Sequence, residues 1–151
     1  EYKVNGNKIN SIKNFAKKHI SYCSQLPFIT RGTILENIII FDSSINKDKL
    51  NFAIKASCVD EIINKKNISL DDQISDFGLN FSGGERQRIQ IARAIYYDKE
   101  IIIFDETTSA IEIELEKRIL NNLDKYLSNK VFLFISHRKS NMNLFDNVLQ
   151  I

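Results

Sequence analysis

Two adjacent carboxylates, Asp105 and Glu106, are the residues best placed for chemistry, because they directly follow the apolar run Ile101–Phe104. An acidic pair at an exposed strand end is by itself common and indicates only two solvated side chains. Here the preceding run is typical of a buried strand, and adjacent strand residues face different ways, so two roles are open. One carboxylate can hold Mg²⁺, which takes oxygen ligands and keeps several waters. The other can polarise a water for in-line attack on a phosphate.

A second candidate is the stretch Phe81–Arg88, which reads FSGGERQR. Glycine lets backbone approach a ligand closely, and Ser82 is a good N-cap for the helix that follows. Free amide groups and the positive end of the helix dipole then favour an anion such as phosphate. Ser-Gly-Gly alone predicts no more than a turn before a helix. The continuation GERQRIQIARA is what favours the anion site.

Two further polar residues, His137 and Gln25, each follow a predicted strand. A single histidine at a strand end is usually structural, and an exposed glutamine in a loop is ordinary. Beside the carboxylates, however, His137 can offer a donor to a terminal phosphate.

The elements that position these residues follow from hydrophobic periodicity. We predict a short strand from His19 to near Gln25, helices over 33–40, 48–63, 85–97 and 112–127, a loop over 68–80, and strands over 101–104 and 131–135. The last strand, helix and strand form a βαβ unit, in which a crossover helix makes the two strands parallel. Continuous apolar runs are typical of parallel strands buried on both faces.

Ligands of open α/β sheets bind beyond the carboxyl ends of the strands. We therefore expect Asp105, Glu106 and His137 to meet at one crevice, although they lie far apart in sequence.

Composition limits the class of protein. The chain has 151 residues, of which 43% are hydrophobic and 26% charged, and its net charge is +2. This is ordinary globular usage, enough for one domain with an inserted subdomain. No basic tract occurs, so no nucleic-acid partner is expected. The longest uninterrupted apolar run, Val131–Ile135, is far shorter than the roughly 20 residues that span a bilayer.

In combination, the motifs resemble the nucleotide-binding domain of ABC transporters over nearly the whole chain. The motifs are YCSQ at 22–25 followed by Pro27-Phe28, TILENI at 33–38, FSGGERQR at 81–88, IARA at 91–94, IIIFDETTS at 101–109 and ISHR at 135–138. The resemblance implies an α/β fold: a P-loop NTPase (RecA-like) parallel-sheet core, truncated at its N-terminus, with an inserted α-helical subdomain. Residues 1–28 and 100–151 are then expected to form the core, and 29–99 the helical subdomain with the signature loop.

The resemblance also implies roles for individual residues, with ATP and Mg²⁺ as cofactors. Asp105 is expected to hold Mg²⁺ and Gln25 to touch it, Glu106 to act as general base, and His137 to be the switch histidine. Ser82, Gly83 and Gly84, followed by Glu85, correspond to the signature loop, which binds the γ-phosphate of ATP held by the opposite subunit.

The expected partners are the transmembrane domains of an ABC transporter and a second nucleotide-binding domain, at the cytoplasmic face of the membrane. TILENI is typical of exporters, and 75–78 (SDFG) lies where exporters carry a loop that faces the coupling helices. Residues 1–12 look like the strand and turn that follow the first helix of this domain.

Three features depart from the family pattern. Glu85 replaces the usual glutamine and adds a negative charge near the phosphate. Glu112 replaces the aspartate that usually ends the D-loop (109–112), which affects communication between the two sites. No G-x-x-x-x-G-K-[ST] occurs, so we expect the P-loop to lie before Glu1 or to be degenerate.

Three functions are compatible with these observations. The leading interpretation is an ATPase subunit, or part of one, that powers export, with these 151 residues inactive alone. The alternative is a non-catalytic docking module that cannot bind ATP in cis. A chromosome-maintenance ATPase is the weakest reading, because no heptad run separates Gln25 from Ser82.

Overall fold

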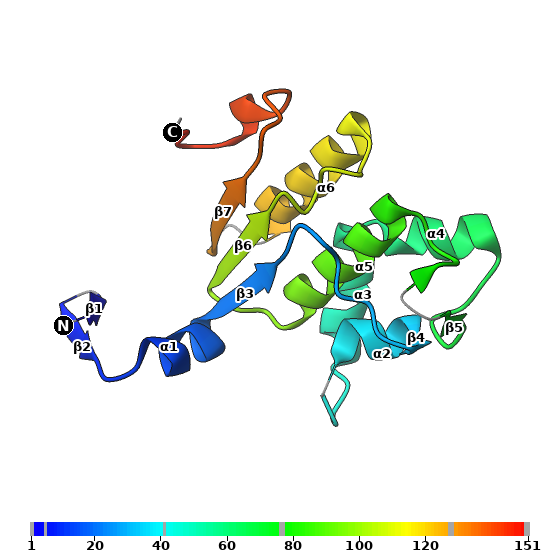
Figure 1. Ribbon diagram of the computed structural model, residues 1–151, viewed down its shortest axis with the longest axis horizontal. Helices are drawn as coiled ribbons and strands as arrows, with labels where there is room; N and C mark the ends of the chain where they lie inside the picture. The colour runs from blue at the N-terminus through cyan, green and yellow to red at the C-terminus, as the bar shows by residue number, and fades with distance from the viewer. Residues whose placement is uncertain (1, 5, 41, 76–77, 127–128, 150–151) are drawn as a thin grey trace.

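A three-stranded parallel sheet, in the order β3-β6-β7, forms the centre of the fold (Figure 1). Its strands are β3 (Ile20–Cys23), β6 (Ile101–Asp105) and β7 (Val131–Ile135). The computed structural model describes residues 2–4, 6–40, 42–75, 78–126 and 129–149. The parallel βαβ unit and the parallel-sheet core predicted from the sequence are confirmed.

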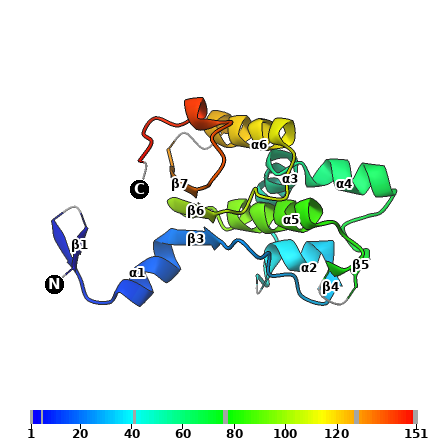
Figure 2. The ribbon, with the colours of Figure 1, turned by 45° about the horizontal axis from the view of Figure 1, so that its top comes forward.

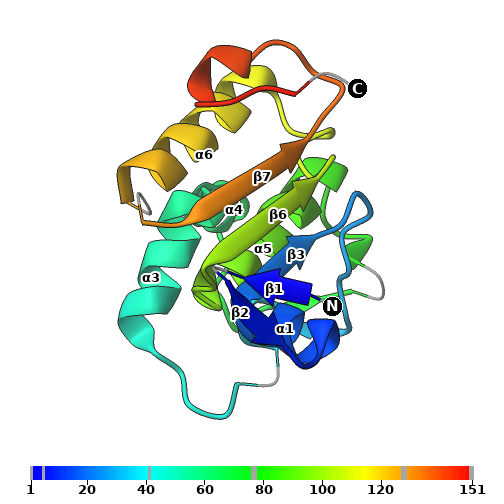
Figure 3. The ribbon, with the colours of Figure 1, turned by 90° about the vertical axis from the view of Figure 1, so that its left-hand side faces the viewer.

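One face of this sheet is the core of the domain. Cys23 pairs with Phe104 and Phe104 pairs with Phe134, so these side chains share a face. The rings of Phe104 and Phe134 stack with their centroids 4.5 Å apart. The chain passes from β3 to β6 through α5 (Gly83–Tyr96) and from β6 to β7 through α6 (Ile113–Tyr126), and each time it moves to the next strand on the same side in the sheet. Because such connections are right-handed, both helices lie on the same face. Figure 3 shows α5 behind the strands.

The opposite face of the sheet is open. Tyr22, Val131, Leu133 and Ile135 point to it and are 57%, 60%, 51% and 49% exposed. The prediction that the strands are buried on both faces is therefore wrong for β7. The physical reason is that, among the described residues, the helices that follow β3 and β6 cover only one side.

The helical part of the chain lies between β3 and α5 in sequence. It contains α2 (Ile34–Ile39), α3 (Lys47–Ala56) and α4 (Val59–Lys66). It also contains two strands of two residues each, β4 (Gly32–Thr33) and β5 (Gln73–Ile74), which pair with each other antiparallel. Figure 2 shows α2, α3 and α4 at the end of the molecule away from β1. Thr33 and Glu36 form a reciprocal capping box at the start of α2, which explains why this helix begins where the sequence predicts.

The single helix predicted over 48–63 is instead two helices, and this prediction is wrong. Ser57 ends α3, and its hydroxyl donates to the carbonyl oxygen of Ala53 at 2.7 Å. Cys58 then adopts φ +59°, which a right-handed helix does not allow. Nη1 of Arg88 donates to the Cys58 carbonyl oxygen at 2.9 Å and so ties this break to α5.

The N-terminal residues form a hairpin of β1 (Tyr2–Val4) and β2 (Asn7–Ile9), followed by α1 (Ile12–His19). The hairpin corresponds to the strand and turn expected over 1–12, whereas the sequence reading missed α1. Ser11 caps α1 by accepting the Asn14 amide at 3.3 Å, a short-range signal that was available. The helices predicted over 33–40, 85–97 and 112–127 are confirmed to within a few residues.

The open face of the sheet predicts self-association of the 151-residue chain. Exposed apolar patches and unpaired strand edges favour contacts between copies. Leu133→Lys should shift the chain toward monomer in sedimentation velocity, because it places a charge at the centre of this face. Leu149→Lys, at a residue that is 84% exposed outside the sheet, is the matched control. A wild-type chain that stays monomeric at high concentration contradicts the prediction.

Candidate active site

Glu106 lies at the centre of a cluster at the carboxyl end of β6. Nε2 of Gln25 donates to its Oε2 at 2.7 Å, and Nε2 of His137 lies 2.9 Å from its Oε1. The Glu106 side chain is 23% exposed, whereas His137 is 92% exposed. Three segments, the ends of β3, β6 and β7, thus converge on one carboxylate, as the βαβ topology predicts.

The backbone fixes the position of Glu106 firmly. Its φ is +47°, a left-handed conformation that costs a non-glycine residue about 1–2 kcal/mol. The Glu106 amide donates to the carbonyl oxygen of Ile135 at 2.9 Å. The hydroxyl of Thr107, which is buried, donates to the carbonyl oxygen of Cys23 at 2.8 Å. Bonds to β7 and to β3 therefore hold this strained turn, as is common at functional sites.

Asp105 has a partner that the sequence reading missed. The hydroxyl of Tyr22 donates to Oδ2 of Asp105 at 2.5 Å. This hydrogen bond raises the pKa of Tyr22 above its ordinary value, because it stabilises the protonated phenol beside a carboxylate. Tyr22 pairs with Ile103 in the sheet, so strand register would have placed it within reach of Asp105.

The donor set fits Mg²⁺ bound together with a phosphate. Mg²⁺ is usually held by one or two carboxylates plus substrate phosphates and waters. Asp105 supplies a carboxylate, and Gln25 keeps its Oε1 available because Nε2 is the atom that donates to Glu106. In the part of the chain that the structure describes, no group of three or more His, Cys, Asp and Glu side chains forms a dedicated metal cage.

The Ser82–Glu85 loop begins α5 with a reciprocal capping box. The Glu85 amide donates to Oγ of Ser82 at 3.2 Å, and the Ser82 amide donates to Oε2 of Glu85 at 2.8 Å. Gly84 must be glycine, because a Cβ there would lie 2.6 Å from the carbonyl oxygen of Ala110. Ser82, Gly84, Ala110 and Glu112 line a cleft of about 460 Å³. The loop thus packs directly against the segment that follows Thr108.

That segment, 109–111, is held from two sides by residues that sequence reasoning did not single out. Gln87 Nε2 donates to Oγ of Ser109 at 3.1 Å, and its Oε1 accepts the Ala110 amide at 2.9 Å. From the other side, Arg138 Nη1 donates to the Ile111 carbonyl oxygen at 2.6 Å and Nη2 donates to that of Ser109. The only available signal was their position next to FSGG and to His137.

Arg138 is itself anchored by a buried carboxylate. Its Nη1 lies 3.6 Å from Oε2 of Glu116, and Nδ2 of Asn141 donates to the same oxygen at 2.9 Å. Thr108 donates to Oε1 of Glu116. Glu116 is 5% exposed and thus has both oxygens occupied, as a buried charge requires.

The predicted site residues therefore fall into two groups. Gln25, Asp105, Glu106 and His137 meet at one edge of the sheet. Ser82, Gly83, Gly84 and Glu85 lie on the other side of segment 109–112, and no hydrogen bond or ion pair between described residues joins the two groups directly. Of the expected exporter loop at 75–78, Asp76 and Phe77 lie outside the described residues.

Comparisons with known proteins give a consistent family. The profile of the family described as "ABC transporter" matches residues 1–109. The lactococcin-G-processing and transport ATP-binding protein LagD of Lactococcus lactis subsp. lactis is 39% identical over 134 residues, 88% of this chain and 19% of that protein. The transport/processing ATP-binding protein ComA of Streptococcus pneumoniae is 36% identical over 137 residues, 89% of this chain and 18% of that protein.

Among solved structures, a bacterial Atm1-family ABC exporter with ATP bound superposes with a TM-score of 0.79 at 26% identity. The match covers 86% of this chain and 23% of that one. This chain spans less than a fifth of the curated relatives LagD and ComA, at 19% and 18% of their lengths. The chain belongs to the ABC transporter family, and its fold is that of the family's ATP-binding domain.

Proposed function

We propose that the chain is part of an ABC exporter and binds and hydrolyses ATP together with a second nucleotide-binding domain. The observation that carries the proposal is the placement of Glu106 between Gln25 and His137, beside Asp105, at the carboxyl edge of the sheet. The name of LagD, which includes lactococcin-G processing and transport, and the similarity to an Atm1-family ABC exporter support the export role.

In this proposal Glu106 is the general base. A water attacks the terminal phosphorus, the bond to the bridging oxygen breaks, and the water's proton passes to the Glu106 carboxylate. His137 and Gln25 orient that carboxylate, since each lies within 3 Å of one of its two oxygens. His137 is the more exposed partner and therefore faces the arriving nucleotide.

Asp105 and Gln25 are the residues that would hold Mg²⁺. When bound, this ion neutralises charge on the phosphate oxygens. The Tyr22 hydroxyl donates to Oδ2 of Asp105, so the other carboxylate oxygen, Oδ1, would be the one that takes the ion.

The Ser82–Glu85 loop is proposed to contact the phosphate of a nucleotide held by the second domain. Support comes from its separation from Glu106 by segment 109–112 and from its place at the cleft beside Ala110 and Glu112.

The proposed membrane partner would dock on an apolar surface beside Gln25. Leu26, Phe28 and Leu79 are 81%, 62% and 78% exposed. Gly78 lies against Ile29, since a Cβ there would be 3.3 Å from Ile29 Cγ2, which brings the two loops together. We propose that transmembrane domains contact this surface at the cytoplasmic face of the membrane.

None of the helices in the described part of the chain has the length and apolarity to cross a bilayer. The division into a core (1–28 and 100–151) and a helical subdomain (29–99) stays part of this proposal.

The 151 residues alone should bind Mg-ATP only at about millimolar concentration or weaker. They contain no G-x-x-x-x-G-K-[ST] to cradle the phosphates with its amides and lysine. Isothermal titration calorimetry tests this, with the full-length protein as positive control. Micromolar affinity of the 151 residues would show that they bind nucleotide by themselves.

Glu106→Gln in the full-length protein should slow ATP turnover by about 10²–10⁴-fold, the usual contribution of a positioned base. Glutamine keeps the size and one acceptor oxygen, so it can still accept from Gln25, but it cannot take the proton. ATP binding should stay near normal and an ATP-bound dimer should accumulate. Asp124→Asn, an exposed carboxylate elsewhere, is the control. Wild-type turnover in Glu106→Gln would refute the proposed base.

Asp105→Asn and His137→Ala should impair ATP turnover in other ways than Glu106→Gln. Asp105→Asn should raise the Mg²⁺ concentration for half-maximal turnover by about tenfold or more, because the metal loses a charged ligand. His137→Ala should slow turnover with a milder effect on ATP affinity. Mg²⁺ titrations of turnover and nucleotide-binding measurements separate the two. Equal Mg²⁺ dependence in wild type and Asp105→Asn would contradict the metal role.

A further inference from the structure

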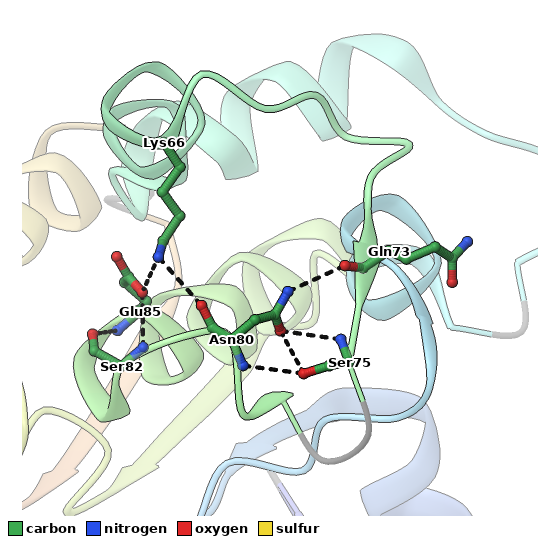
Figure 4. Close-up of polar contacts among 6 residues, drawn as sticks. All are labelled: Lys66, Gln73, Ser75, Asn80, Ser82 and Glu85. Atoms are coloured by element: carbon green, nitrogen blue, oxygen red, sulfur yellow. Dashed lines mark hydrogen bonds and ion pairs between the residues drawn. The ribbon is translucent and has the colours of Figure 1, made fainter.

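Lys66, the last residue of α4, lies against the loop that begins α5 (Figure 4). Its Nζ is 3.3 Å from Oε2 of Glu85, donates to the Asn80 carbonyl oxygen at 3.3 Å, and lies 5.2 Å from the centre of the Phe81 ring. The side chains of Lys66 and Glu85 are 32% and 12% exposed. Water therefore screens this pair less than it would a pair on a free surface.

The Glu85 carboxylate is fixed where it would oppose an incoming anion. The same Oε2 that contacts Lys66 accepts the Ser82 amide at 2.8 Å, as part of the capping box. The carboxylate cannot turn away without losing this cap, so its charge stays beside the first amides of α5. An uncompensated negative charge there repels a phosphate.

We propose that Lys66 is a positioning residue of the Ser82–Glu85 loop, whose ammonium neutralises Glu85 and thereby lets the N-terminus of α5 receive the phosphate of a nucleotide. This inference rests on the proposed function. It also explains how the chain tolerates an acid where the family usually has glutamine.

The ammonium is positioned from both ends of the loop. Asn80, whose carbonyl oxygen accepts from Lys66, is tied back through its side chain. Its Nδ2 donates to the Gln73 carbonyl oxygen at 3.2 Å, and its Oδ1 accepts the Ser75 amide at 3.0 Å. Figure 4 shows Lys66 reaching down from α4 between Asn80 and Glu85. The end of α4 and the segment after β5 thus hold the charge in place.

If Lys66 acts by neutralising Glu85, its effect must depend on the charge at residue 85, whereas a purely structural role of Lys66 would not. Glu85→Gln keeps an oxygen to accept the Ser82 amide but removes the charge. Lys66 should therefore matter when residue 85 is acidic and matter little when it is neutral. A contact with Asn80 and Phe81 alone would matter equally in both backgrounds.

The experiment is a double-mutant cycle on ATP hydrolysis by the full-length protein. Lys66→Met, which keeps the apolar stem, should raise the KM for ATP about tenfold, the usual size for one lost charged contact, with kcat changed less. Lys66→Met combined with Glu85→Gln should return the KM to within about twofold of Glu85→Gln alone. Lys66→Arg, which keeps the charge, should stay near wild type.

Lys55→Met is the matched control. Lys55 lies in the last turn of α3, is exposed, carries the same charge, lies outside the cleft that Ser82 and Gly84 line, and has no ion-pair partner among the described residues. Its KM should stay within about twofold of wild type. An equal rise in KM for Lys55→Met would assign the effect to the general positive field and overturn the pair.

The other possible results also test the inference. An unchanged KM in Lys66→Met, or the same KM rise in both backgrounds, overturns the inference but leaves the proposed function intact. If Lys66→Met fails to fold, recovery of folding and of KM by the added Glu85→Gln supports compensation, and failure to recover contradicts it. A wild-type protein without ATPase activity overturns the proposed function and this inference with it.

Discussion

The parallel register of β3, β6 and β7 is the constraint on which the site depends. Because Cys23, Phe104 and Phe134 stand side by side in the sheet, the next residues of each strand must emerge at one edge. The stacked rings of Phe104 and Phe134 fix this register from the core face. A slip of one residue between β6 and β7 would turn one of the two rings to the open face and shift His137 relative to the carboxylates. Packing beneath the sheet is therefore what sets the geometry of Glu106 above it.

The strain at Glu106 is maintained by the same arrangement. Its left-handed backbone is unfavourable by itself, yet its amide bonds to β7 and the hydroxyl of Thr107 bonds to β3. Both neighbouring strands thus hold the turn. As a result the carboxylate is held between Gln25 and His137, an arrangement that suits the general base we propose, since such a base would need little reorganisation.

The sequence predicts the features that local patterns determine, but not those that depend on contacts between residues far apart in the chain. The βαβ topology, the cap at Ser82 and the convergence of Asp105, Glu106 and His137 follow from periodicity and strand ends. The break at Cys58 does not, because nothing local in the apolar pattern marks it, and its carbonyl oxygen accepts from Arg88, which lies 30 positions away in sequence. Tyr22 went unnoticed because only the register of β3 against β6 brings it to Asp105. The open face of β7 was not predicted because an apolar run indicates only that burial of these side chains is favourable. It does not indicate that another element of the chain covers them.

The two groups of site residues do not contact each other directly, but segment 109–111 connects them. Gln87, two residues beyond Glu85 on α5, binds segment 109–111 from one side, and Arg138, the neighbour of His137, binds it from the other. Buried Glu116 holds Arg138 in that position, with its second oxygen satisfied by Thr108. A shift of α5 relative to β7 would have to break hydrogen bonds at both ends of this segment. The distance between the Ser82–Glu85 loop and His137 is thus set by a short chain of polar contacts. The close approach of Gly84 to Ala110 is part of the same arrangement, because a Cβ at residue 84 would lie 2.6 Å from the Ala110 carbonyl oxygen and push α5 away from the segment.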